Sequence, residues 1–244
     1  MVREETDEEL HHNLQEALRT ELVLYSGSSY RFLHDRVQEA AYSLIPEARR
    51  AEAHLRIGRL LAAHTPPENR EEAIFEIVNQ LNRGAALIAA RNEKEQLADF
   101  NLMAGKRAKA STAYVSALSY FISGAATMPN DGWEQRPNIM FALELHRAEC
   151  EFLTGELAAA EERLTMLSSR AATIIDQAAL AGLRIDLYTT MNRIDRAVEV
   201  CLGYLSRLGI EWSAHPTADE ARREYERIWS LLGGRETETL MTYP

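Results

Sequence analysis

The sequence predicts a mainly α-helical protein, with a short N-terminal module that contains one β-hairpin and a longer region of paired helices. Ala, Leu, Glu and Arg dominate the 244 residues, whereas Gly and Pro number 12 and 7. This composition favours helix, because such side chains lose little freedom there. Apolar residues recur at helical spacing along most of the chain. Two β-prone runs, "ELVLY" and "YRFLH", flank a Ser/Gly turn and predict the hairpin.

The N-terminal module is expected to hold three helices around this hairpin. The first helix is predicted over 6–20, with Thr6 or Asp7 as its cap. The second follows the hairpin and has an apolar face of Leu33, Val37, Ala40, Ala41 and Leu44. Pro46 ends it and can begin a third helix, which runs to about Ala63. The expected inward face of the third helix is Ala53, Ile57, Leu60 and Leu61. This order is compatible with a winged-helix-like fold whose wing is the hairpin.

A strong helix breaker separates two regions. The segment "HTPPENREE" at 64–72 places two prolines beside polar residues, which ends one helix and begins another. We therefore expect one domain over 1–65 and a second over 69–244. In the second domain, helices are predicted over 69–83, 93–109, 112–127, 137–153, 156–170, 173–190, 194–208 and 217–232. Loops are predicted over 128–137 and 213–220, the latter ending in a helix cap.

Small residues recur where paired helices would cross. The tetratricopeptide pattern has a small residue late in one helix, an alanine twelve residues later, then bulky and small residues and a proline. The first matching set is Gly105, Ala117, Phe121, Gly124 and Pro129. The second is Ala148, Gly155, Ala160, Leu164 and Leu167, and a looser third is Tyr188, Ala197 and Cys201. The crossing alanines are 43 and 37 residues apart, against a usual period of about 34, so an irregular tetratricopeptide-like α-solenoid is predicted. A generic antiparallel helix bundle is the alternative.

Charge and composition exclude several classes. The net charge is −10, which disfavours nucleic-acid binding because such binding depends on neutralising phosphates. The three lysines, Lys94, Lys106 and Lys109, lie on one predicted helix, and no dense basic run occurs. The acidic N-terminus has no apolar core typical of a signal peptide, and no apolar run reaches the ~20 residues of a membrane span. We expect a cytoplasmic protein with two buried free thiols, Cys150 and Cys201.

No catalytic or metal site is predicted. A phosphate-binding GxxxxGK[ST] loop is missing, because Gly105-Lys106 is preceded by Phe100 at the first glycine position and followed by Arg107 at the hydroxyl position. The seven histidines form no convincing metal site. His11 and His12 point different ways on a helix, and His146 with Cys150 offers only two ligands.

The triplet His34-Asp35-Arg36 has two interpretations. It can be a helix start, in which Asp35 accepts backbone N–H bonds and complements the helix dipole. It can also face a nucleotide held by a neighbouring domain, because imidazole and guanidinium groups donate to phosphate oxygens. The residue types alone do not decide between them.

Four segments resemble one family of signalling proteins. "YRFLHDRVQEAAYSLIPE" at 30–47 is similar to its "Y-x-FLHDRVQQAAYSLI", and "IFEIVNQLNRGAALI" at 74–88 is similar to "lFdIVNQLN-x-G-x-x-LI". "LADFNLMAGKRAKASTAYVSALSYFISGAATM" at 97–128 and "HRAECEFLTGELAAAEERL" at 146–164 match two further family segments. The family comprises large bacterial and fungal proteins that join a Ser/Thr protein-kinase-like domain, a STAND-type AAA+ ATPase, a helical region, a GAF domain and often a histidine kinase.

The resemblance implies a regulatory, non-catalytic segment. Residues 1–65 would be the winged-helix end of the ATPase module, and the rest its tetratricopeptide-like helical region. His34 would inherit a nucleotide-phosphate contact, and ATP or ADP would bind only with an upstream ATPase domain. The chain would be a fragment, the product of a truncated gene or a degenerate relative. An exposed apolar face is expected at about 228–232, as at the end of a truncated solenoid. Expected partners are proteins or neighbouring domains, not nucleic acid or membrane. The alternatives are a free-standing helical-repeat adaptor and a winged-helix DNA-binding regulator.

Overall fold

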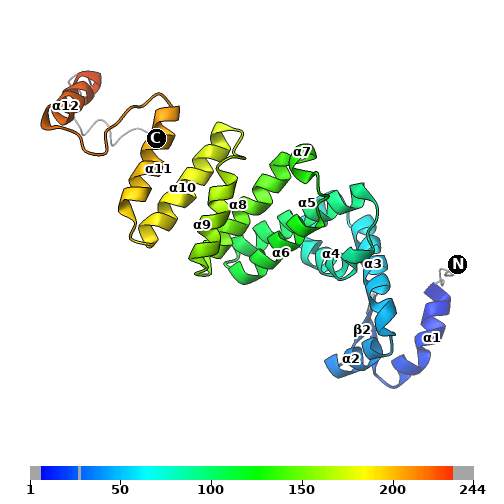
Figure 1. Cartoon of the computed structure of the whole chain (residues 1–244). Helices are drawn as coiled ribbons and strands as arrows, with labels where there is room; N and C mark the ends of the chain where they lie inside the picture. The colour runs from blue at the N-terminus through cyan, green and yellow to red at the C-terminus, as the bar shows by residue number, and fades with distance from the viewer. Residues whose placement is uncertain (1–6, 27–28, 233–244) are drawn as a thin grey trace. The chain divides into compact units, whose positions relative to one another are not determined.

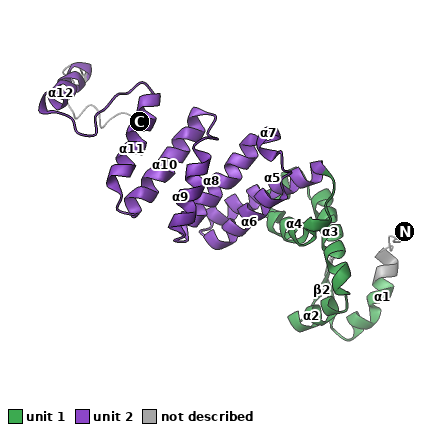
Figure 2. Ribbon diagram, in the orientation of Figure 1, with its two compact units in different colours: residues 1–90 green, residues 91–244 purple. Residues whose placement is uncertain are grey.

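The structure is a computed structural model that describes residues 7–26 and 29–232 (Figure 1). It confirms a mainly helical protein with a two-stranded antiparallel hairpin. The chain divides into two compact units, residues 1–90 and residues 91–244 (Figure 2). Each unit has its own helix packing.

Unit 1 begins with a helix and the predicted hairpin. Its elements are α1 (Asp7–Arg19), β1 (Val23–Ser26), β2 (Ser29–Phe32), α2 (Asp35–Ser43), α3 (Glu47–His64), the short 3-10 helix η1 (Pro67–Asn69), α4 (Arg70–Gly84) and the 3-10 helix η2 (Ala85–Leu87). The strands pair with Val23 opposite Phe32 and Ser26 opposite Ser29. Pro46 is the residue before α3, where its fixed φ and missing N–H cost the helix nothing.

Helices α3 and α4 pack closely through two glycines. A Cβ atom at Gly58 would lie 2.6 Å from the Leu81 side chain, and one at Gly84 would lie 2.8 Å from the Ala51 carbonyl oxygen. Ile74, Ile77 and Val78 of α4 are fully buried. Because α4 completes this packing, the compact unit extends to residue 90, whereas the predicted domain boundary lies at 65–69.

The structure corrects the predicted inward faces of α2 and α3. No residue of α2 is buried, and Leu44 is 82% exposed. On α3, Ile57 and Leu60 are exposed, and the buried side is His54, Leu55 and Gly58. Periodicity located an apolar stripe correctly, but α4 packs on the neighbouring stripe, where Gly58 permits close approach. The predicted faces are therefore only partly buried, at Val37, Ala41, Ala53 and Leu61, and their other residues lie on the surface.

Unit 2 is a succession of helices in which each of the longer helices from α5 to α11 packs on the next (Figure 1). Its elements are α5 (Arg91–Ala110), α6 (Tyr114–Thr127), α7 (Gly132–Gln135), α8 (Pro137–Leu153), α9 (Leu157–Leu167), α10 (Ile174–Thr190), α11 (Ile194–Arg207) and α12 (Ala218–Leu232). The predicted loop at 128–137 contains the single turn α7, which the sequence did not predict. Backbone N–H groups of Glu134 and Gln135 donate to the Asp131 carbonyl, which closes this turn.

Most predicted small positions lie in close contacts between helices. Ala117, Ala148 and Ala160 are fully buried, and Ala197 is 6% exposed. A Cβ atom at Gly105 would lie 2.3 Å from the Phe121 ring. The small side chains thus permit helix pairs to approach, as the pattern requires.

Three further predicted positions have different surroundings. A Cβ atom at Gly124 would lie 2.7 Å from Leu143, so this glycine also permits a close approach. Gly155 lies in the turn between α8 and α9 with φ +89°, and a Cβ atom there would meet nothing within 4 Å. Its backbone conformation, rather than helix crossing, requires glycine. Pro129 follows the end of α6, and its carbonyl accepts from the Gly132 N–H.

The C-terminal part of the described chain is highly exposed. Every described side chain from Ser206 onward is exposed, including Ile228, Trp229 and Leu231 of α12, so the expected apolar face at this end is present. Cys150 is buried as predicted, whereas Cys201 is only partly buried. Within the described ranges, no helix combines the length and apolar character of a membrane span.

Candidate functional site

The main candidate site is a groove on unit 1, which we name the α2–α3 groove. It has a volume of about 590 Å³ and is lined by Phe32 of β2, five residues of α2, Ile45, three residues of α3 and two of α4. Its apolar lining includes Tyr42, Ile45 and Ile57. Asp35 and Glu39 line it together with Arg83. Exposed apolar side chains of this kind are typical of surfaces that bind proteins.

A buried histidine anchors the wall of this groove. His54 is 7% exposed, and its Nδ1 donates to the Gln80 Oε1 at 2.6 Å. Its Nε2 lies at hydrogen-bond distance from the Tyr42 hydroxyl, 3.0 Å away. The guanidinium of Arg50 lies 5.0 Å from the centre of the Tyr42 ring and donates to the Ile45 carbonyl. This chain of contacts ties α2, α3 and α4 together, and it fixes the shape of the groove.

The predicted triplet lies beside the groove, and only one of its members lines it. His34 precedes α2 with extended backbone dihedrals of −129° and 137°, and its side chain makes no capping hydrogen bond. Asp35 is the first helical residue and lines the groove, where its charge suits the helix N-terminus. Asp35 is therefore not the cap that the helix-start interpretation assigned to it. His34 and Arg36 are exposed.

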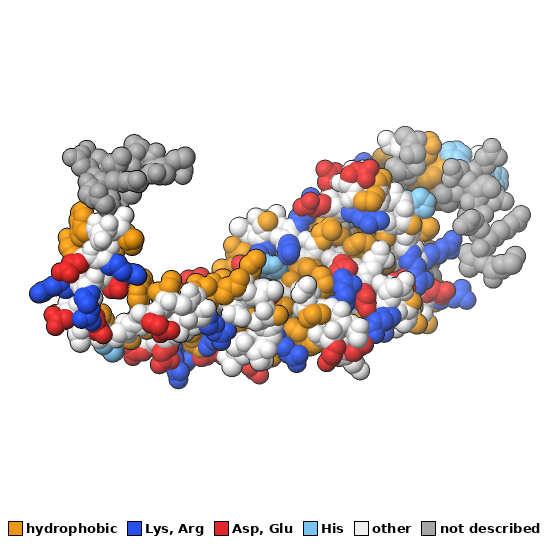
Figure 3. All heavy atoms as spheres, turned by 90° about the horizontal axis from the view of Figure 1, so that it is seen from above, with side chains coloured by type: hydrophobic (Ala, Val, Ile, Leu, Met, Phe, Trp, Pro, Cys, Tyr) orange, Lys and Arg blue, Asp and Glu red, His pale blue; other side chains and the backbone are white. Residues whose placement is uncertain are grey.

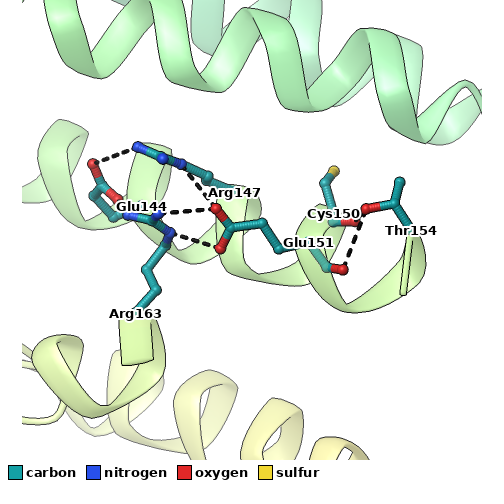
Figure 4. A network of polar contacts seen from close by, with 6 residues as sticks. All are labelled: Glu144, Arg147, Cys150, Glu151, Thr154 and Arg163. Carbon is teal, nitrogen blue, oxygen red and sulfur yellow. Dashed lines mark hydrogen bonds and ion pairs between the residues drawn. The ribbon is translucent and has the colours of Figure 1, made fainter. Parts of the chain in front are cut away.

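Unit 2 holds a buried network of charges between α8 and α9 (Figure 4). Glu144 and Glu151 of α8 are 7% and 5% exposed. Arg163 of α9 donates Nη1 to Glu144 and Nε to Glu151, the latter at 2.8 Å. Arg147 donates to Glu151 at 3.1 Å. Two carboxylates and two guanidinium groups balance, so the network fastens α8 to α9 without net charge.

A second polar cluster joins α5 to α8. The Nζ of Lys109 lies 2.5 Å from the Glu149 carboxylate and 3.1 Å from Nδ1 of His146. The His146 ring stacks on Phe121, with centroids 5.4 Å apart. Hydrogen bonds from His146 and Lys109 lower the pKa of Glu149 from 4.5 to about 2, although burial opposes them. Burial raises the pKa of the Cys150 thiol to about 11. These contacts stabilise the helix pair, and the unionised thiol is a poor nucleophile.

This cluster predicts acid sensitivity. The folded-state pKa of Glu149 lies below its unfolded value, so its stabilisation is complete above pH 4.5 and lost as the pH falls toward 2. Its side chain is 32% exposed, and solvent screening reduces the effect to about 1–2 kcal/mol. Glu149→Gln should therefore lower the free energy of unfolding near pH 6 and change it little near pH 2. Urea unfolding followed by circular dichroism measures this, with the exposed Glu162→Gln as control. An equal loss at both pH values would contradict the assignment.

Sequence reasoning missed the residues that organise both sites. His54, Gln80, Glu144, Glu151 and Arg163 lie in ordinary amphipathic helices, where charged and polar residues usually face solvent. One feature of the sequence could have indicated the buried network of unit 2. Glu144, Ala148 and Glu151 are spaced so that they share a helix face with buried residues. Across residues 7–26 and 29–232, no three His, Cys, Asp or Glu side chains come together to hold a metal ion.

Apolar exposure is not confined to unit 1. Hydrophobic side chains, orange in Figure 3, also lie on the surface of the C-terminal helices of unit 2. Ile194 and Val198 of α11 are 51% and 37% exposed. Both units thus offer surfaces suited to contacts with proteins.

Comparison with known proteins gives one relative. The chain is similar to hybrid signal transduction histidine kinase G of Dictyostelium discoideum, with 27% identity over 236 residues. The match covers 87% of this chain but spans only 7% of the relative. No protein-family model and no solved structure matches the chain. The similarity supports a link to multidomain signal-transduction proteins.

Proposed function

We propose that this chain is a non-catalytic regulatory segment of a multidomain signalling protein of the STAND ATPase and histidine-kinase type. Residues 1–65 act as the winged-helix-like end of a nucleotide-binding module, and residues 69–244 form a tetratricopeptide-like solenoid in the cytoplasm. The segment couples the nucleotide-binding module to output domains of the same polypeptide. The similarity to a hybrid histidine kinase supports this setting.

The exposure of α2 is the observation that carries the proposal. An amphipathic helix normally buries its apolar stripe, yet no residue of α2 is buried and Leu44 is 82% exposed. The adjoining α2–α3 groove continues this surface. The occupant we assign to it is the preceding nucleotide-binding module, which would cover α2 and complete the core. A nucleotide state that favours the docked arrangement would then shift the regulatory equilibrium.

Replacing an exposed apolar residue of this surface should abolish docking. Leu44→Asp places a charge at the centre of the proposed contact and should weaken binding at least about 100-fold, the effect of losing a central apolar anchor. Isothermal titration with the polypeptide encoded in frame upstream of residue 1 measures this. Val115→Asp, on the 71% exposed Val115 of α6, is the matched control. Equal binding of the two variants would refute docking through α2, and a free-standing adaptor would become the better account.

The His34 position supplies a second, independent prediction. In the assembly with the upstream module, His34→Ala should reduce affinity for ADP about 10-fold, the value of one charge-assisted hydrogen bond to phosphate. Arg36→Ala should act in the same direction. His12→Ala, an exposed histidine of α1, should leave ADP affinity unchanged. Fluorescence titration with a labelled ADP tests this, and unchanged affinity in His34→Ala would leave the residue as a helix start only.

A further inference from the structure

A small pocket in unit 2 has an unusual arrangement of arginines. It has a volume of about 290 Å³ and lies where α10 and α11 meet the end of α9. Arg184 of α10 and Arg207 of α11 line it, together with Ser168 and Tyr204. Gly203 forms part of its wall, and a Cβ atom there would meet nothing within 4 Å. The glycine therefore leaves open space that a ligand group can enter.

Arg184 is incompletely satisfied. Its Nη1 donates to the Ser168 hydroxyl at 3.1 Å, and its guanidinium lies 5.8 Å from the centre of the Tyr188 ring. Its Nε is buried and has no hydrogen-bond partner among the described residues. Buried donors without partners are rare in folded proteins and call for a physical explanation. A carboxylate that reaches this side chain would provide one, because Nε and one Nη of a guanidinium form a planar fork that matches the two carboxylate oxygens.

The local charge also suits an anion. Glu199 is the acidic residue of the lining, and its carboxylate already pairs with Arg196 at 3.0 Å. Within residues 7–26 and 29–232, neither Arg184 nor Arg207 has a carboxylate partner. The lining thus carries two guanidinium groups and one carboxylate, a net positive charge, in a chain whose net charge is −10. Leu180 and Val200 give the pocket apolar walls beside them.

We infer that this pocket binds an acidic side chain of a partner peptide, with Arg184 as the carboxylate ligand and Arg207 as a second positive charge. The inference deepens the proposed function, on which it rests for the idea that the partner is a protein. The apolar walls suit an aliphatic neighbour of the acidic residue. Peptide binding to the unit 2 pocket and docking of a module on unit 1 are measured in separate experiments. A failure of the pocket inference can therefore be distinguished from a failure of the proposed function.

The test observes Arg184 directly in the whole chain. In a ¹⁵N–¹H NMR spectrum, the Nε–H signal of Arg184 is assigned by its loss in Arg184→Lys. The probe that is titrated is N-acetyl-Leu-Glu-Leu-amide. The same peptide with Gln in place of Glu is the uncharged control, and the same peptide with phosphoserine in place of Glu tests whether a phosphate binds instead of a carboxylate. We expect a saturable shift with the Glu peptide, at a Kd of about 1–10 mM, as suits a small ligand held by one charged group.

Two glycine variants make the test specific to the pocket. An added Cβ atom at Gly203 meets nothing within 4 Å, so Gly203→Leu adds bulk inside the pocket and should abolish the shift, whereas Gly182→Leu, at an equally open helical position outside the lining, should preserve it. Arg207→Gln should weaken binding several-fold, and the exposed Arg222→Gln should not. Equal shifts with the Glu and Gln peptides, or a shift that survives Gly203→Leu, would overturn the inference. A shift with the phosphoserine peptide but not with the Glu peptide would also overturn the inference, because the ligand of the pocket would then be a phosphate and not a carboxylate.

Discussion

Replacing Arg163 with methionine should lower the free energy of unfolding by about 3–5 kcal/mol, because the change removes one partner from a buried charge network. Glu144 and Glu151 would keep only Arg147, which lies 3.1 Å from Glu151 but 4.0 Å from Glu144. Two carboxylates that are less than 10% exposed would then share one guanidinium. Urea unfolding followed by circular dichroism measures the loss.

An exposed ion pair provides the matched control for Arg163. Arg193 pairs with Glu161 at 2.9 Å, with side chains 48% and 30% exposed. Arg193→Met should cost less than about 1 kcal/mol, as is typical of surface pairs. Adding Glu144→Gln to Arg163→Met should recover part of the loss, since Arg147 still pairs with Glu151 at 3.1 Å and no buried carboxylate is then left without a guanidinium partner. Similar losses in the two single variants would contradict a structural role for the buried network.

Replacing Gly105 with alanine should lower the free energy of unfolding by about 2–3 kcal/mol through overpacking. The added Cβ atom would lie 2.3 Å from the Phe121 ring. Phe121 is fully buried and stacks on His146, so its ring has little space to move. Thermal unfolding and urea titration of the variant measure the effect, and Phe121→Leu in the same chain should recover part of it.

Gly182 supplies the control for this substitution. It also lies inside a long helix, but a Cβ atom there would meet nothing within 4 Å. Gly182→Ala should therefore raise the free energy of unfolding by about 0.5–1 kcal/mol, because alanine restricts the unfolded chain and favours helix. Destabilisation of both variants to the same extent would contradict close packing as the reason for glycine at 105.

Local patterns predicted the elements well because their causes are local. Helical periodicity and the Ser/Gly turn between "ELVLY" and "YRFLH" sufficed for the helices and the hairpin. Thr217, predicted near the start of the last helix, caps α12 by accepting from the Glu220 N–H, while Glu220 accepts from the Thr217 N–H. Such caps involve residues three apart, which a sequence displays directly.

The candidate sites depended on tertiary contacts that local patterns do not contain. Periodicity identified the apolar stripe of α3 that contains Ile57 and Leu60. Which stripe a neighbouring helix covers depends on the tertiary fold, and α4 covers the other side of α3. The same limit applies to Arg163, whose partners lie 12 and 19 residues away on another helix. His34, by contrast, was predicted from its residue type alone. In the structure it precedes α2 beside the groove, and its side chain makes no capping hydrogen bond.

The most direct test of the central claim is the reading frame upstream of the codon for Met1. The proposed regulatory role requires a nucleotide-binding module in the same polypeptide, so that frame should encode a GxxxxGK[ST] loop that follows a predicted strand and opens a helix. A stop codon in frame before any such module would contradict the claim, because α2 would then have no module of its own chain to cover it. The exposed α2 surface would in that case belong to a free-standing helical-repeat adaptor.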